Sequence, residues 1–184
     1  MSLNYAEIKY YDIANGPGVR TSLFVSGCTH KCSECFNSIA WSFDYGERFT
    51  EDVCKKIYKS CEPEYITGLT VLGGEPFEPE NQGALLPFLG GFRAMYPDKS
   101  VWIFSGYTFE QITGKEKARC TTELSGEMLS YADVLVDGRF EKDKKDLTLR
   151  FRGSSNQRLI DVQKTLSSGE IVLWSDDLAT DSRH

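Results

Sequence analysis

Long apolar stretches are missing from this sequence of 184 residues. No run of about 18 apolar residues is present, so we expect neither a segment that spans a membrane nor a signal peptide at the start of the chain. Basic residues are also in short supply, because 21 Lys and Arg stand against 27 Asp and Glu, which gives a net charge of −6. Nucleic-acid binding depends on neutralising phosphates, so this balance argues against a nucleic-acid partner.

Internal repeats and low-complexity linkers are absent as well, which favours a single domain over residues 1–184. With 40% hydrophobic residues the chain can bury a sizeable core. It is too short for a complete eight-stranded (β/α) barrel, which typically needs about 250 residues. The last stretch, residues 175–184, is acidic with few apolar residues, and we expect it to be a mobile tail.

Cysteine is unevenly distributed. Three of the six cysteines, Cys28, Cys32 and Cys35, lie within eight residues as C-x3-C-x2-C. Since we expect no secretion signal, this pattern favours metal binding or catalysis over disulfides, and it predicts a reducing, cytoplasmic location. Cys54 and Cys61 fall at helical spacing and are expected to pack in the core, whereas Cys120 is expected to be a surface or incidental thiol.

Two kinds of metal site remain open for the three clustered cysteines. A structural zinc site is closed by four ligands, usually from paired C-x2–4-C knuckles, and no second knuckle follows here. A cubane iron–sulfur cluster held by three thiolates keeps one iron free to bind a substrate. The spacing favours the cluster over zinc.

Four short apolar runs are each followed by glycine and polar residues, which is typical of buried parallel strands that end at a shared pocket. The runs are residues 23–25, 70–72, 101–104 and 134–136, with the endings FVSGC, VLGGE, IFSGY and LVDGR. Between them we expect a helix capped by Thr50 and a second helix that starts or kinks near Pro87. We expect residues 171–174 to form a terminal strand.

The motifs together resemble a known family. The cysteine loop resembles that of radical S-adenosylmethionine enzymes, and NGPGVRTSLFVSGC at 15–28 is similar to the glycyl-radical activating enzymes. Within these, GGEP at 73–76, WIFSGY at 102–107, VDGRFE at 136–141 and GSSNQRL at 153–159 are most similar to the activases of anaerobic ribonucleoside-triphosphate reductases. Glu34 departs from the broader superfamily, in which an aromatic residue often precedes the last cysteine.

The resemblance implies an α/β fold, an incomplete (β/α) barrel with a mainly parallel sheet of about five or six strands. It also implies a radical S-adenosylmethionine oxidoreductase in which Cys28, Cys32 and Cys35 hold a 4Fe-4S cluster. The cluster would reductively cleave S-adenosylmethionine. The cofactor-binding candidates are Glu34, Cys35, Phe36, Gly73, Gly74, Glu75, Ser105 and Asp137.

The implied substrate is a glycine of the large anaerobic ribonucleotide reductase subunit, and the implied electron donor is a protein such as a flavodoxin. The basic residues Arg150, Arg152 and Arg158 are candidates for docking this partner, since their charge opposes that of the chain. Three alternatives stay open. They are an activase of another glycyl-radical enzyme, a small-molecule radical enzyme, and a noncatalytic metal-binding or electron-transfer module.

Overall fold

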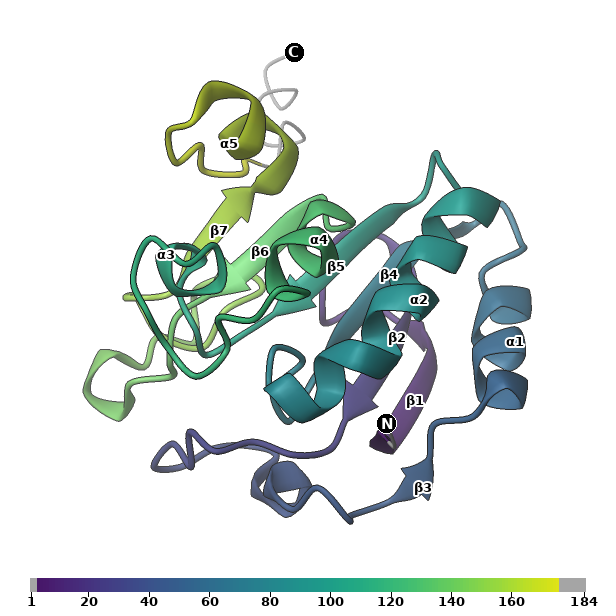
Figure 1. Ribbon diagram of the computed structural model, residues 1–184, viewed down its shortest axis with the longest axis horizontal. Helices are drawn as coiled ribbons and strands as arrows, with labels where there is room; N and C mark the ends of the chain where they lie inside the picture. Colours follow the sequence, from purple (N-terminus) through teal and green to yellow (C-terminus); the bar gives the residue numbers. More distant parts are fainter. Residues whose placement is uncertain (1–2, 176–184) are drawn as a thin grey trace.

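The computed structural model describes residues 3–175 (Figure 1). The predicted tail at 175–184 lies outside the described residues except for Ser175. Within the described part, the strands are β1 (Asn4–Asp12), β2 (Val19–Val25), β3 (Glu47–Arg48), β4 (Ile66–Gly73), β5 (Ser100–Phe104), β6 (Val134–Asp137) and β7 (Arg158–Asp161). The helices are α1 (Glu51–Ser60), α2 (Pro79–Met95), α3 (Phe109–Ile112), α4 (Ser125–Ser130) and α5 (Val162–Ser168), with 3-10 turns η1 (Ser38–Trp41) and η2 (Lys142–Lys144).

The strands form one open mixed sheet in the order β3-β1-β2-β4-β5-β6-β7. The prediction of an α/β fold is confirmed, but the open sheet does not confirm the predicted incomplete barrel. All four apolar runs lie in the parallel strands β2, β4, β5 and β6. The prediction of five or six strands is wrong, because the described residues form seven, of which β1, β3 and β7 pair antiparallel at the edges. Most side chains of these edge strands are exposed or half-buried, and no continuous apolar run marks them.

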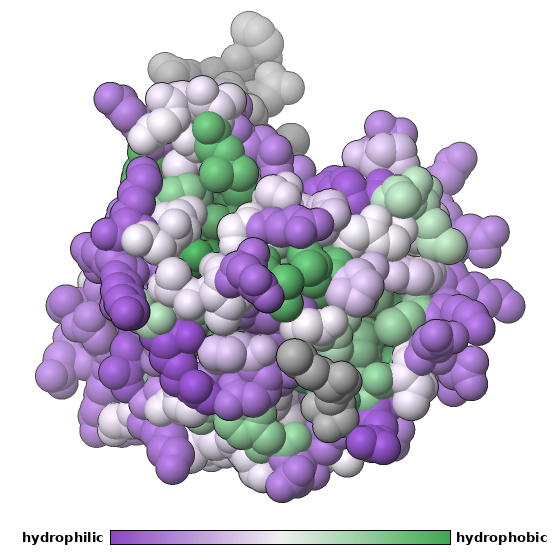
Figure 2. All heavy atoms as spheres, in the orientation of Figure 1, coloured by the Kyte–Doolittle hydropathy of each residue, from purple (hydrophilic) through white to green (hydrophobic). Residues whose placement is uncertain are grey.

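Successive side chains of the parallel strands point to opposite faces of the sheet, and each face has its own apolar cluster. Helices α1 to α4 cover one face of the sheet (Figure 1), where the larger core gathers side chains such as Leu69, Val71 and Ile103. Figure 2 shows this covered face, in which hydrophilic residues form most of the outline and hydrophobic ones lie between them. The other face carries a smaller cluster around Trp102 and Val136. The candidate site described below borders this second face of the sheet.

Local signals explain where the main helices start. Thr50 caps α1 as predicted, because its hydroxyl accepts a hydrogen bond from the Val53 backbone N–H. The helix predicted near Pro87 begins earlier, at Pro79, which suits the first turn of a helix. Pro87 lies inside α2, so the prediction of a start there is wrong.

The chain's other predicted features have mixed outcomes. Cys54 and Cys61 pack with the core as predicted. Cys120 is fully buried, so the expectation of a surface thiol is wrong. Residues 171–174 form no regular strand, since their pairing is the isolated bridge between Ile160 and Leu173. Among residues 3–175, no helix has the length and apolar character needed to cross a membrane.

Candidate active site

The cysteines lie on a loop at the carboxyl edge of the parallel strands. This cysteine loop, residues 26–37, leaves β2 after Val25 and is closed at its base by two backbone hydrogen bonds, from Gly27 to Ala40 and from Cys28 to Trp41. The next strand ends lie alongside, because Val25 pairs with Gly73 in the sheet. Parallel strands therefore bring the loop and the glycine-rich strand ends to one edge.

All three clustered cysteines line one cavity of about 120 Å³, which we call the cysteine cavity. Its walls include the predicted site residues Phe36, Gly73, Gly74, Glu75 and Ser105, together with Trp41 and Gln157. The structure thus brings together residues from the ends of β2, β4 and β5. Cys54, Cys61 and Cys120 are not among the lining residues.

The donor set of this cavity fits an iron–sulfur cluster better than a closed zinc site. Three thiols come from one short loop, no fourth cysteine lines the cavity among the residues described, and the lining histidine, His30, has its Nε2 3.2 Å from Glu75 Oε2. Within residues 3–175, no three His, Cys, Asp or Glu side chains, the three loop cysteines included, lie close enough together to hold a single metal ion, so this spacing does not distinguish the two kinds of site. A structural zinc site would require four ligands around one ion. Trp41, whose buried indole nitrogen has no hydrogen-bond partner in the described structure, also lines the cavity.

The protein groups around Cys28 disfavour its thiolate form. Burial, and then the nearby carboxylate of Glu75, raise the pKa of the Cys28 thiol to about 12. Metal ligation requires the thiolate, so binding a cluster here must release a proton and compensate the buried negative charge.

Two buried carboxylates hold the cysteine loop in place. Glu78 Oε1 accepts hydrogen bonds of 2.6 Å from both the backbone N–H and the hydroxyl of Thr29. Glu75 Oε2 lies 3.2 Å from His30 Nε2. Glu78 was not predicted from the sequence, although the second acid of the GGEPFE segment, three residues after Glu75, is a signal that could have indicated it.

Glu75 also joins the ends of two strands. Its carboxylate accepts hydrogen bonds from Ser105 Oγ at 2.8 Å, from Gly106 N at 2.7 Å and from Phe77 N at 2.9 Å. The side chain is 1% exposed. Both carboxylate oxygens therefore accept hydrogen bonds within the protein, and the Glu75 side chain holds the wall of the cavity in place.

Gly74 is a glycine because the chain itself approaches closely. A Cβ at this position would lie 2.5 Å from the carbonyl oxygen of Gly27, at the base of the cysteine loop. Next to this contact, Gly74 N donates to Val25 O and Glu75 N donates to Gly27 O. The structure therefore explains this glycine by the backbone before Cys28, and the role of Gly74 in cofactor binding stays a prediction.

Glu34 and Phe36 border a larger cavity of about 450 Å³, which we call the outer cavity. It adjoins the cysteine cavity, since Cys32, Cys35 and Phe36 line both. Glu34 Oε1 pairs with Lys142 Nζ at 2.6 Å, and this ammonium lowers the pKa of Glu34. Phe36 is 82% exposed at the rim.

Asp137 does not line either of these cavities. Its buried carboxylate accepts a hydrogen bond of 2.8 Å from Phe109 N and pairs with the Arg158 guanidinium at 2.5 Å. Arg158 also contacts Glu110 at 2.7 Å. Both carboxylates raise the pKa of Arg158. The structure therefore pairs Arg158 with two carboxylates of its own fold, and its part in docking stays a prediction.

Comparison with known proteins adds independent information. The model of the 4Fe-4S single cluster domain family matches residues 14–160. The chain is 41% identical over 157 residues to the anaerobic ribonucleoside-triphosphate reductase-activating protein of Pasteurella multocida (strain Pm70), covering 84% of this chain and 95% of that protein. It is 39% identical to the protein of the same name from Enterobacteria phage T4, over 85% and 93% of the two chains. It is 35% identical to that from Escherichia coli (strain K12), over 84% and 96%.

Proposed function

Because the chain belongs to the family of anaerobic ribonucleoside-triphosphate reductase-activating proteins, we propose that it generates a glycyl radical on such a reductase by reductive cleavage of S-adenosylmethionine. The family confirms the resemblance that the motifs indicated. The observation that carries the proposal is the cysteine cavity, where three thiols from one loop face the glycine-rich ends of the neighbouring strands.

Cys28, Cys32 and Cys35 are the proposed ligands of the 4Fe-4S cluster. When bound, the cluster supplies one electron to the sulfonium of S-adenosylmethionine, so that methionine and 5′-deoxyadenosine form and the partner's glycine, having lost its α-hydrogen atom, keeps the unpaired electron. The protein's own task is to hold and shield these groups. Glu75 and Glu78 fix the cysteine loop through His30 and Thr29.

The walls of the two cavities support exclusion of water from this reaction. Leu72, Phe104 and Phe140 border both the cysteine cavity and the outer cavity, and they present apolar surface at the junction. Radical chemistry benefits from such shielding, since water and proton leakage promote side reactions. We assign Gly73, Gly74 and Ser105 to the cofactor side of the cysteine cavity, and Glu34 and Phe36 to its border with the outer cavity.

The proposal includes a cytoplasmic setting and a protein electron donor such as a flavodoxin. All six cysteines are free thiols in the structure, which agrees with a reducing compartment. The proposed class is a radical S-adenosylmethionine oxidoreductase whose substrate is another protein.

Electron paramagnetic resonance of the reduced, cofactor-supplied mixture with the anaerobic reductase tests the proposal. We expect a doublet that collapses when the reductase is made with α-deuterated glycine, because the doublet arises from the remaining α-hydrogen. Abundant 5′-deoxyadenosine without an organic radical on the reductase would contradict the proposal and indicate a small-molecule substrate. A protein that binds zinc and takes up no iron would favour the noncatalytic alternative.

A further inference from the structure

One segment of the chain reverses its overall charge. Residues 139–152, here called the basic arm, contain six Lys and Arg but three Asp and Glu, whereas the whole chain carries a net charge of −6. In Figure 1 this segment and the cysteine loop both lie on the left of the molecule. Lys142 pairs with Glu34 at 2.6 Å, and Arg139 donates a hydrogen bond of 2.5 Å to the His30 carbonyl oxygen. The basic arm therefore contacts the cysteine loop directly, through this ion pair and this hydrogen bond.

The basic arm also presents the most exposed large apolar side chain of the described residues. Leu147 is 89% exposed, followed by Phe36 of the cysteine loop at 82%. Both border the outer cavity, as do Lys145 and Arg152 of the basic arm. Exposed apolar side chains beside a cavity and ringed by charge are typical of protein–protein interfaces.

We propose that the basic arm and Phe36 form the docking surface for an acidic face of the partner protein, with a partner loop entering the outer cavity. This inference rests on the proposed function, which requires a partner glycine to reach the cofactor. The outer cavity has room for such a loop, because its volume of about 450 Å³ lies between the cysteine loop and the basic arm. It also adjoins the cysteine cavity. The charge reversal supplies the orientation, because opposite charges steer two surfaces together and fix their register.

An inserted loop fits these features better than an electron-donor protein does. Electron transfer needs only proximity between two redox centres and is served by small, transient interfaces. It gives no reason for an open cavity between two exposed apolar side chains. Removal of a hydrogen atom, in contrast, requires the partner's backbone to come within contact distance of the reacting group. The basic arm lies where such a loop would pass.

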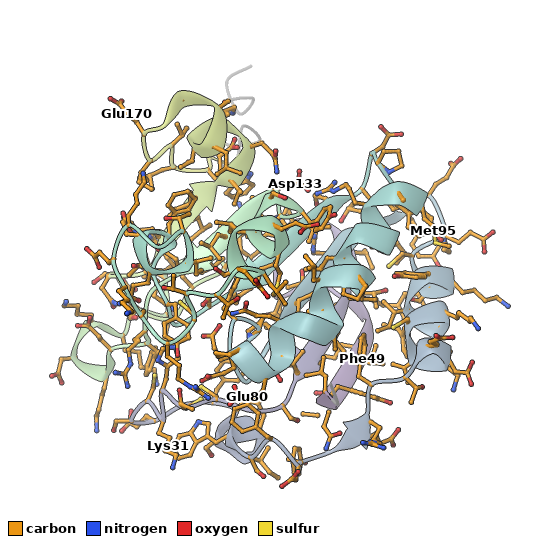
Figure 3. The ribbon with its side chains drawn as sticks, in the orientation of Figure 1. Lys31, Phe49, Glu80, Met95, Asp133 and Glu170 are labelled. Atoms are coloured by element: carbon orange, nitrogen blue, oxygen red, sulfur yellow. The ribbon has the colours of Figure 1, made fainter. Side chains whose placement is uncertain are left out.

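The test measures equilibrium binding of the cluster-loaded protein to the anaerobic reductase. Leu147→Asp should weaken binding by about tenfold, which corresponds to about 1.4 kcal/mol. Lys145→Glu should weaken it several-fold and flatten its dependence on salt, because an attractive charge becomes repulsive. The matched control is Met95→Asp, which should leave binding unchanged. Met95 is 58% exposed at the end of α2, on the opposite side of the view from Lys31 (Figure 3).

A second measurement separates docking from the chemistry at the cluster. Partner-free formation of 5′-deoxyadenosine with a chemical reductant should be the same in Leu147→Asp as in the unaltered protein. If Leu147→Asp and Lys145→Glu bound the reductase as tightly as the unaltered protein and still generated its radical, the docking inference would be overturned and the proposed function would stand. Slower electron uptake from flavodoxin, with reductase affinity intact, would assign the surface to the donor and would also overturn it. Failure of the unaltered protein to bind or activate any reductase would instead refute the proposed function.

Discussion

Thr29 directs both its backbone N–H and its hydroxyl at the same atom, Glu78 Oε1, at 2.6 Å each. Thr29 follows the first clustered cysteine, whereas Glu78 is fully buried immediately before α2. The other oxygen of this carboxylate lies 3.0 Å from the Arg119 guanidinium. A buried charge is thus paired with a cation and hydrogen-bonded, the condition under which burial is tolerated. The arrangement couples the position of the cysteine loop to the start of α2.

Glu78→Ala should therefore loosen the cysteine loop. We expect a loss of roughly 1–3 kcal/mol in the free energy of unfolding, since the Thr29 donors lose their acceptor. We also expect a lower iron content after anaerobic reconstitution. Glu80→Ala is the control, because Glu80 contacts the same Arg119 from a half-exposed position. It should change stability by about 0.5 kcal/mol or less. Equal iron content in all three proteins would show that Glu78 does not position the loop.

Gly74→Ala should also reduce iron content. Its new Cβ would lie 2.5 Å from the Gly27 carbonyl oxygen, so the base of the cysteine loop must move. If Gly74 faced only the cofactor, iron would stay bound and only cofactor cleavage would suffer. Iron analysis and thermal unfolding distinguish the two cases.

Gly126→Ala provides the matched substitution for that experiment. Gly126 lies in α4, and a Cβ there has no neighbour within 4 Å. Alanine should keep the iron content unchanged and raise stability by about 0.4–1 kcal/mol, because it restricts the unfolded chain. A comparable loss of iron in both variants would mean that the effect of Gly74→Ala is not specific to the contact with Gly27.

The three clustered cysteines should behave differently from the other three. Replacing Cys28, Cys32 or Cys35 by Ala should abolish the brown colour and most of the bound iron of the reconstituted protein. Cys61→Ala should keep both, at a cost of about 1 kcal/mol in stability, because Cys61 is fully buried in the core. Absorption spectra and iron analysis check this contrast. Retention of a full cluster by a Cys32→Ala protein would require a different ligand set.

Much of this architecture was predictable because it follows from local patterns. Apolar runs ending in glycine identified β2, β4, β5 and β6, and the short cysteine spacing identified the loop beyond β2. The edge strand β1 was missed because its side chains are largely half-buried or exposed and follow no apolar run. An edge strand needs only one neighbour, so its sequence is weakly constrained.

The less predictable features depend on contacts between distant parts of the chain. Glu78 lies 49 positions from Thr29, so no local pattern reveals their hydrogen bonds. Asp137 has the strand-end position of a cofactor-binding residue, but its carboxylate is paired with Arg158, 21 positions away. An acidic side chain at a strand end serves a ligand or its own fold depending on which cation the tertiary structure brings to it. Sequence position alone does not distinguish the two.

The contact between Arg158 and Glu110 gives stability a specific dependence on pH. The hydrogen bonds from Arg158 lower the pKa of Glu110 from its ordinary value of 4.5. A carboxyl with a lowered pKa in the folded state stabilises the protein fully above its ordinary value. This contribution is lost as the pH falls through the folded-state value. Glu110→Gln should consequently destabilise the protein by about 0.5–1 kcal/mol at pH 7.

The difference between Glu110→Gln and the unaltered protein should shrink when the pH falls below the ordinary carboxyl value of 4.5 and through the lowered pKa of Glu110, because the unaltered side chain then takes up a proton. Urea unfolding at several pH values measures it. Arg158→Met should be much more damaging, by about 3–5 kcal/mol, because it also leaves the buried Asp137 carboxylate without its cation. If Glu110→Gln lowered stability equally at all pH values, its effect would be one of packing and not of charge. If Arg158→Met cost no more than Glu110→Gln, the Asp137 carboxylate would have to be stabilised by Phe109 N alone, and the assignment of Arg158 to the fold would fail.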